Sequence, residues 1–200
     1  MTTYDNSFYE LIASGSSSSA AIIAPLVYST YSPTSVIDIG CGTGVWAKAF
    51  ETLGAYAVGV DGAYVENPVI DNFIAHDISV DLPATERFGL AVCLEVAEHL
   101  PESRAGSFVA ELCAKADVVL FSAAIPFQTG THHINCQWQS YWAQHFADNG
   151  YGPVDWIRWE VWNNPMVEPW YRQNTILYEM DAPAKDVYDV VHRDIHYWGR

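Results

Sequence analysis

The chain has 200 residues, half of them hydrophobic, which is enough for one domain with a substantial core. Its formal net charge is −15, and its nine Lys and Arg residues are scattered along the sequence. Because proteins that bind nucleic acids or anionic membranes cluster such residues, the composition argues against both kinds of partner.

Neither export nor a membrane span is predicted. The first apolar run, AAIIAPLV, is short and interrupted by Pro25, and no basic segment precedes it. The four cysteines form no CxxC pair. We therefore expect a cytoplasmic protein with free thiols, with two disulfides as the alternative.

Residues 1–33 are expected to form a helical entry segment. Serine is a good N-cap, so the run Ser14–Ser19 favours a helix that begins after it and covers Ala20 to Tyr28. A flexible linker is the alternative for the serine run.

Residues 34–125 alternate between strand and helix patterns. The β-branched run at 35–40 predicts a strand buried on both faces, and residues 45–54 predict a helix that ends at Gly54. Four further strands and one helix are expected, in chain order a strand at 55–62, a strand at 72–78, a strand at 88–96, a helix at 101–115 and a strand at 117–125. This alternation predicts an α/β domain with a doubly wound, mostly parallel sheet.

Residues 126–180 change pattern. A loop is followed by an aromatic helix at 138–149, and we expect a final antiparallel pair of strands at 154–162 and 174–180. The tail, 181–200, is too mixed to assign. All of these segments are expected to belong to one domain over residues 1–200.

A glycine-rich turn, DIGCGTG, follows the first strand. Gly40, Gly42 and Gly44 would let a ligand approach the backbone, and the next helix would offer free N–H groups to an anion. Val45 stands where a G-x-G-x-x-G fingerprint needs its third glycine, which counts against NAD and FAD.

Acidic residues end the next two strands. Asp61 could accept both hydroxyls of a ribose, and Asp77 could accept from an adenine amino group. Either acid alone could be a solvated strand end. Together with the glycine turn they favour a nucleoside ligand, because parallel sheets bind ligands at the carboxyl ends of their strands.

These motifs resemble class I S-adenosylmethionine-dependent methyltransferases. The matching segments are VIDIGCGTG (36–44), VGVDG (58–62), HDI (76–78) and LAVCLEVAEHLPE (90–102). The last is similar to the small-molecule, type 11-like branch. The resemblance implies a Rossmann-like fold with a seven-stranded sheet, helices on both faces and an antiparallel C-terminal strand.

The resemblance also implies S-adenosylmethionine as cofactor, converted to S-adenosylhomocysteine. Its expected ligands are Asp38, Gly40, Cys41 and Gly42 at the methionine end, Asp61 at the ribose, Asp77 and Ile78 at the adenine, and Leu94, Glu95 and Val96 near the sulfonium, with Gly44 and Gly62 in the same turns.

A small-molecule acceptor is expected. Nucleic-acid aminomethylases of the resembled fold carry an Asn-Pro-Pro-aromatic type of motif after the fourth strand, where this chain reads LEVAEH. WNNPM (162–166) lies far downstream and lacks the second proline and the aromatic residue.

The segment THHINCQWQSYW (131–142) follows the fifth strand and should lie on the cofactor's side of the sheet. Adjacent His132 and His133 would point in different directions on an extended chain, and no acidic cluster is visible, so no metal is predicted. The structural alternative is that both histidines are ordinary loop residues and that the tryptophans pack on the sheet.

The same segment is similar to small bacterial and phage methyltransferases found among glycan-modifying genes. Their loop reads approximately G-x-x-H-x-N-x-Q-W-x-x-Y-W, which matches Gly130, His133, Asn135, Gln137, Trp138, Tyr141 and Trp142. This similarity singles out His133 as the base, with Asn135 and Gln137 orienting the acceptor and His99 as the rival base.

The expected activity is methyl transfer to a small polar acceptor, most simply a hydroxyl of a sugar or related metabolite. Methylation of an amine or carboxylate, or a binding module without chemistry, are the alternatives. The oligomeric state is not predicted.

Overall fold

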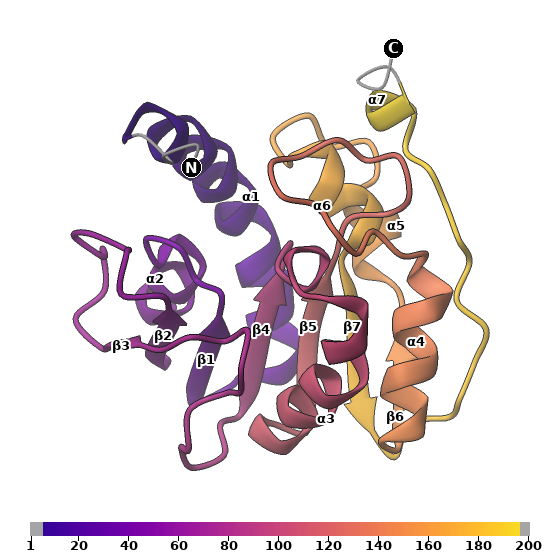
Figure 1. Ribbon diagram of the computed structural model, residues 1–200, viewed down its shortest axis with the longest axis horizontal. Coiled ribbons are helices and arrows are strands. Elements are labelled where there is room, and N and C mark those ends of the chain that lie inside the picture. The colour runs from indigo at the N-terminus through magenta and orange to yellow at the C-terminus, as the bar shows by residue number, and fades with distance from the viewer. Residues whose placement is uncertain (1–5, 197–200) are drawn as a thin grey trace.

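The computed structural model describes residues 6–196 and contains a seven-stranded sheet in the order β3-β2-β1-β4-β5-β7-β6 (Figure 1). Its strands are β1 (Ser35–Ile39), β2 (Tyr56–Asp61), β3 (Phe73–Ala75), β4 (Leu90–Leu94), β5 (Val118–Ser122), β6 (Tyr151–Val154) and β7 (Ile176–Met180). The first five strands are parallel, and β7 is antiparallel to both β5 and β6. The predicted fold class is confirmed.

Helices cover both faces of the sheet. The larger ones are α1 (Asn6–Tyr31), α2 (Val45–Thr52), α3 (Ala105–Lys115) and α4 (Gln139–Asp148). Alternate residues of β4 supply the two cores: Leu90 and Val92 pack with α1 and α2, whereas Ala91 and Cys93 pack with α3 and α4. Because every strand residue of β4 is buried, its sequence is continuously apolar.

The serine run lies inside α1, so the predicted N-cap is wrong although the helix itself is confirmed. The hydroxyls of Ser18 and Ser19 donate to the carbonyl of Gly15, at 3.0 and 2.8 Å. Ser16 exchanges a 3.0 Å hydrogen bond with the hydroxyl of Tyr171. The hydroxyls of these serines thus find hydrogen-bond partners in the helix backbone or in Tyr171, so the residues can lie inside the helix rather than at its N-cap.

The strand predicted at 154–162 is also wrong. β6 ends at Val154, and α5 (Ile157–Val161) follows. Ile157 and Val161, four residues apart, are both buried in the same core, which is a helical period. Arg158, between them, is buried as well, and its ion pair with Asp155 offsets the cost of burying its charge. The antiparallel pairing expected for this region is nevertheless present between β6 and β7.

The tail, which was not assigned from sequence, packs on the C-terminal half. It runs beside α4 and ends in α7 (Arg193–His196), as Figure 1 shows. Asp189 accepts hydrogen bonds from the amide and hydroxyl of Ser140, both at 2.8 Å. The amide of His192 donates to Gln173 Oε1 at 2.7 Å, in α6 (Pro169–Asn174). The ends of the entry segment and of the tail, residues 1–5 and 197–200, lie outside the described residues.

All four cysteines are free thiols, and three of them are buried. Among residues 6–196, no helix has the length and apolar character needed to cross a membrane.

Candidate active site

A pocket of about 780 Å³ opens at the carboxyl ends of β1, β2, β3 and β4. The sheet order places β1 and β4 side by side, so the pocket lies where the chain reverses its direction of strand addition. Its walls are formed by Gly40, Gly42, Asp61, Gly62, Ala63, Tyr64, Ala75, His76, Asp77, Ile78, Ser79, Glu95, Val96, His99, Leu100 and His132.

Most of the predicted cofactor residues line this pocket: Gly40, Gly42, Asp61, Gly62, Asp77, Ile78, Glu95 and Val96. The other four predicted residues lie beneath it. Asp38 is buried and accepts the amide of Ala47 at 3.1 Å, which fixes the start of α2, and burial raises its pKa to about 7. Cys41 and Leu94 are buried in the core, and Gly44 caps α2 with a φ of 91°.

Two glycines of the turn after β1 differ in what the structure requires of them. Gly40 has a φ of 73°, and a Cβ there would lie 2.4 Å from Cγ2 of Val96, so this position needs glycine for packing as well as conformation. A Cβ on Gly42, by contrast, would meet nothing within 4 Å. The wall at Gly42 is therefore bare backbone, which fits a ligand that lies against the main chain.

The Asp61 carboxylate at the end of β2 accepts three hydrogen bonds. Its donors are the amides of Gly42 at 2.7 Å and Gly62 at 2.6 Å, and the hydroxyl of Tyr64 at 2.5 Å. The Tyr64 ring folds over Gly62, since a Cβ there would lie 2.1 Å from Cε1 of the ring. The backbone amides orient the carboxylate, and Tyr64 covers the side expected to face a ribose. No motif in the sequence pointed to Tyr64.

Asp77 is exposed at the pocket wall beyond β3. Its Oδ1 accepts from the amide and hydroxyl of Ser79, at 3.0 and 2.6 Å, and these bonds lower its pKa. The carboxylate is thus held as an anion within reach of a donor in the pocket, as an adenine amino group would require.

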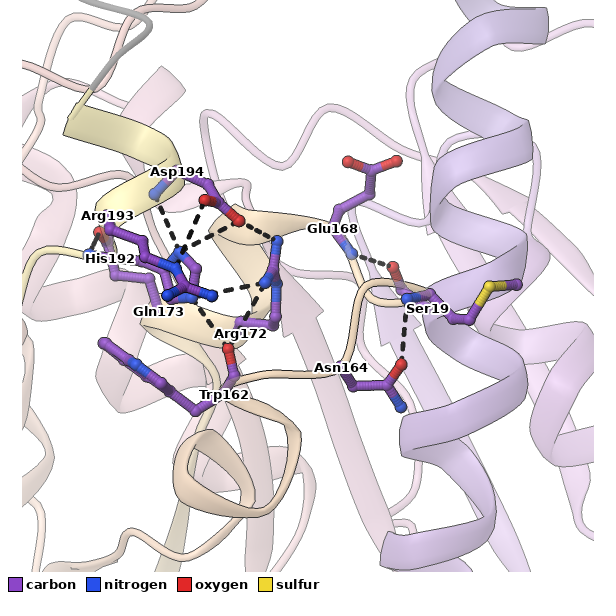
Figure 2. A network of polar contacts seen from close by, with 10 residues as sticks. Ser19, Trp162, Asn164, Glu168, Arg172, Gln173, His192, Arg193 and Asp194 are labelled. Carbon is purple, nitrogen blue, oxygen red and sulfur yellow. Dashed lines mark hydrogen bonds and ion pairs between the residues drawn. The ribbon is translucent and has the colours of Figure 1, made fainter.

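Glu95, directly after β4, is held by amide side chains from distant segments. Gln128 Nε2 donates to it at 2.9 Å and Asn174 Nδ2 at 3.2 Å. Gln173 Nε2 donates in turn to Asn174 at 2.9 Å and is tied to the tail through His192. Figure 2 shows how this part of the tail joins α6. Gln128 lies in the loop after β5 and Asn174 begins the segment predicted as the last strand, and the contact of these amides with Glu95 was not predicted.

The two candidate bases lie together, with ring centroids 5.0 Å apart. His99 lines the pocket, as does His132, whereas His133 lies behind His99. This differs from the sequence prediction, which preferred His133 as the residue facing an acceptor. His132 has a φ of 58°, so the chain turns sharply there and directs the two neighbouring side chains to different places. Burial lowers the pKa of both His99 and His133.

Asn135 does not reach the pocket. The residue is buried, and its side-chain Oδ1 accepts a hydrogen bond from Gln137 Nε2 at 3.0 Å. Its backbone N–H donates to the carbonyl of Glu98 at 2.9 Å. Its geometry is that of a residue that anchors the loop. The alternative in which the tryptophans of this segment pack on the sheet holds for Trp142, which is buried against Phe121, whereas Trp138 is half-buried.

The sequence predicted no metal site, because the paired histidines diverge and no acidic cluster was visible. The side chains of His132 and His133 do lie in different places, but the fold brings His133 next to two other potential metal ligands. Glu98, His99 and His133 each place one potential ligand atom within 4.8 Å of the others.

The N-terminal part of the chain matches a family model. Residues 20–124, more than half of the chain, match the family described as Methyltransferase domain. Ubiquinone biosynthesis O-methyltransferase of Coxiella burnetii is 30% identical over 77 residues, which are 34% of this chain and 33% of that protein. The same enzyme of a Methylobacterium species is 35% identical over 89 residues, covering 40% of this chain and 35% of its own. The matched stretch is thus about a third of the length of these relatives.

Solved structures share the fold. DesVI of Streptomyces venezuelae superposes with a TM-score of 0.69 at 15% identity, over 90% of this chain and 100% of its own. Magnesium protoporphyrin IX methyltransferase of Synechocystis, solved with bound SAM, gives 0.58 at 18% identity, over 90% and 86% of the two chains.

Proposed function

The chain belongs to the methyltransferase domain family, and we propose that it transfers a methyl group from S-adenosylmethionine to a hydroxyl of a small polar acceptor, such as a sugar or a related metabolite. The observation that carries the proposal is the pocket at the strand ends, with bare glycine backbone and Asp61 on one side and His99 on another. The O-methyltransferase relatives support oxygen as the accepting atom.

The lining residues fit the cofactor by their donor and acceptor chemistry. Gly40 and Gly42 leave room for the methionine end against the backbone, and Asp61 offers carboxylate oxygens to the ribose hydroxyls. Asp77 and Ile78 provide an acceptor and an apolar surface for the adenine. When bound, the cofactor supplies a methyl group already activated on a sulfonium. The protein's task is then to align the acceptor oxygen with it, which can supply about 7–11 kcal/mol of the barrier.

Removal of the hydroxyl proton falls to the histidine pair. With the cofactor bound, the acceptor hydroxyl would have to lose its proton as its oxygen takes the methyl group. The lowered pKa values of His99 and His133 keep both rings neutral near pH 7, so their nitrogen lone pairs are available. We assign proton removal to this pair. Asn135 supports the loop that carries His133.

The experiment has two stages. Calorimetric titration with S-adenosylhomocysteine should show one binding site, and the absence of binding would reject the proposal at its root. Labelled S-adenosylmethionine is then offered with panels of sugars, amines and carboxylic acids of similar size. Label appearing on sugars supports the proposal. Label found only on amines or acids would reject the hydroxyl as acceptor in favour of that group. Cofactor binding without transfer to any panel would identify a binding module.

A further inference from the structure

Glu98 is a fully buried carboxyl group whose oxygens lack a well-formed hydrogen bond. It lies in the short 3-10 turn Ala97–His99 after β4, it is 0% exposed, and neither carboxylate oxygen makes a hydrogen bond of standard geometry to another described residue. Its polar neighbours are the backbone amides of Glu98 and Ala124 and the carboxyl group of Glu95. Buried carboxylates are normally hydrogen-bonded, ion-paired or bound to a metal. Among the described residues, the cationic group within 4.0 Å of these oxygens would be a protonated His133, whose Nε2 lies 4.0 Å from Glu98 Oε1.

The two histidines beside Glu98 have their tautomers set by backbone carbonyls. His99 Nδ1 lies 3.2 Å from the carbonyl of His132, and His133 Nδ1 lies 3.2 Å from the carbonyl of Gln128. A carbonyl only accepts, so each neutral ring carries its hydrogen on Nδ1 and keeps a lone pair on Nε2. Metal-binding histidines show this arrangement, in which one nitrogen donates to a carbonyl and the other is free to coordinate.

From this geometry we propose that Glu98, His99 and His133 bind a divalent transition-metal cation, with Zn²⁺ as the best match, at the acceptor end of the pocket. Two nitrogens and one carboxylate oxygen are a usual zinc donor set, and three protein ligands leave a fourth position open, as in catalytic zinc sites. Because His99 also lines the pocket, the open position faces the space where an acceptor would bind.

The distances require only a small closure. Ligands bound at about 2.0–2.2 Å in a tetrahedron lie roughly 3.3–3.6 Å from one another. The three ligand atoms already lie within 4.8 Å of each other, and the Glu98–His133 pair is at 4.0 Å. Each pair of ligand atoms would have to approach by at most about 1.5 Å to reach coordinating distance. The backbone is held in place, since Ile134 and Asn135 both donate their amides to the carbonyl of Glu98 at 2.9 Å.

A rival explanation for Glu98 is a proton. Burial raises the pKa of Glu98 well above its usual value, and the neighbouring Glu95 raises it further. A neutral Glu98 would need no cation, and it would give the group no affinity for one. The two explanations therefore differ in a direct binding measurement.

The role of the ion in catalysis rests on the proposed function, whereas its binding does not. A hydroxyl coordinated at the open position loses its proton to water more readily, and the resulting oxygen is a stronger nucleophile toward the methyl group. This would let a weakly acidic sugar hydroxyl react near neutral pH.

The test uses the full chain after removal of metal by a chelator and dialysis. Titration with Zn²⁺ should reveal one equivalent bound, and Co²⁺ should give the visible absorption of a four-coordinate site. Glu98→Gln and His133→Ala should each weaken Zn²⁺ binding by about a hundredfold or more, since even indirect supports of metal sites are worth 10–100-fold. His145→Ala, on α4 and outside the pocket, is the matched control and should bind Zn²⁺ like the wild type. Circular dichroism establishes that each variant is folded, and His99→Ala provides a further ligand deletion should one variant fail to fold.

Absence of Zn²⁺ and Co²⁺ binding in a protein that still binds S-adenosylhomocysteine overturns the metal site and leaves the proposed function standing. Equal Zn²⁺ affinity in Glu98→Gln, His133→Ala and the wild type also overturns it. Metal binding without cofactor binding would support the site and reject the proposed function. Once an acceptor is known, full methyl transfer by the metal-free protein would overturn the ion's role in deprotonation.

Discussion

The hydroxyl of Tyr64 donates a 2.5 Å hydrogen bond to Oδ1 of Asp61. Tyr64 is 68% exposed and its ring lies across Gly62, so this contact is made from the solvent side of the pocket. The protein thereby satisfies the carboxylate oxygen expected to bind a ribose hydroxyl. Cofactor binding must exchange this internal bond for one to the ligand.

Tyr64→Phe should tighten cofactor binding. Without the phenol, Asp61 has one fewer competing donor, and a net hydrogen-bond contribution of about 0.5–1.5 kcal/mol corresponds to a gain of about 2–10-fold in affinity for S-adenosylhomocysteine. Calorimetry measures the change. Tyr56→Phe, at an exposed tyrosine at the start of β2, should leave the affinity unchanged. Weaker binding in Tyr64→Phe would mean that the hydroxyl contacts the ligand itself.

Alanine at the two turn glycines should separate folding from binding. Gly40→Ala forces a methyl group against Val96 at a left-handed φ, and we expect a loss of about 2–4 kcal/mol in the free energy of unfolding. Gly42→Ala has space around it, so it should cost only about 1 kcal/mol while its methyl group reduces cofactor affinity. Urea denaturation and calorimetry measure the two effects. Partial recovery of stability in Gly40→Ala combined with Val96→Ala would establish the clash, and no recovery would contradict it.

Asp38 should make the protein less stable as pH rises. Its pKa is raised from 3.8 to about 7 in the folded state, so folding takes up a proton between these values. The unfolded chain ionises first, and stability therefore falls as pH increases from about 4 to 7, by roughly 4 kcal/mol over the window. Asp38→Asn, which can still accept from the Ala47 amide, should remove this part of the slope and be more stable than the wild type at pH 8.

Urea denaturation between pH 4 and 8 measures the slope for the wild type and Asp38→Asn. Asp71→Asn, at an exposed acid, removes the same formal charge and serves as the control. Parallel profiles for Asp38→Asn and the wild type would reject the assignment to Asp38.

The histidine pair should affect turnover more than cofactor binding. His99→Ala and His133→Ala are each expected to lower kcat by about 10²–10⁴-fold, because proton removal contributes that much in well-positioned sites. Affinity for S-adenosylhomocysteine should change by less than about threefold, since neither ring is assigned to the cofactor. His145→Ala, at a half-buried position of α4 outside the pocket, is the control. Undiminished turnover in both variants would remove the pair from the mechanism.

Loss of the buried His192 should release the tail. His192 is fully buried, its Nε2 lies 2.9 Å from the carbonyl of Trp162, and its ring lies beside the indole of that residue (Figure 2). His192→Ala should cost about 2–4 kcal/mol and make residues 183–190 sensitive to protease under native conditions. Lys185→Ala, in the exposed part of the tail, should do neither. Protease resistance in His192→Ala would indicate that Arg172 and Asp194, which pair at 2.8 Å, hold the tail on their own.

The parts of the site that sequence could predict are local. The glycine turn, Asp61 and Asp77 each stand at the end of a continuous strand pattern, and a parallel sheet necessarily brings such ends together. Glu98 and His133 meet only because the loop after β5 is bonded to the turn after β4 through backbone atoms, which carry no sequence signal. α5 was missed for a different reason, since five residues are too few to distinguish a helical from an alternating pattern.

The position of β7 between β5 and β6 has a consequence for how the chain is made. A polypeptide that emerges from the ribosome in order completes β1 to β5 first, and the segment from β1 to β5 contains every residue predicted to bind the cofactor. β6 then emerges before the strand with which it pairs, so the outer edge of β5 stays open until residues 176–180 appear. An open edge of this kind invites wrong strand pairing. Slow synthesis between β6 and β7 would therefore lower the yield of folded protein more than a delay elsewhere.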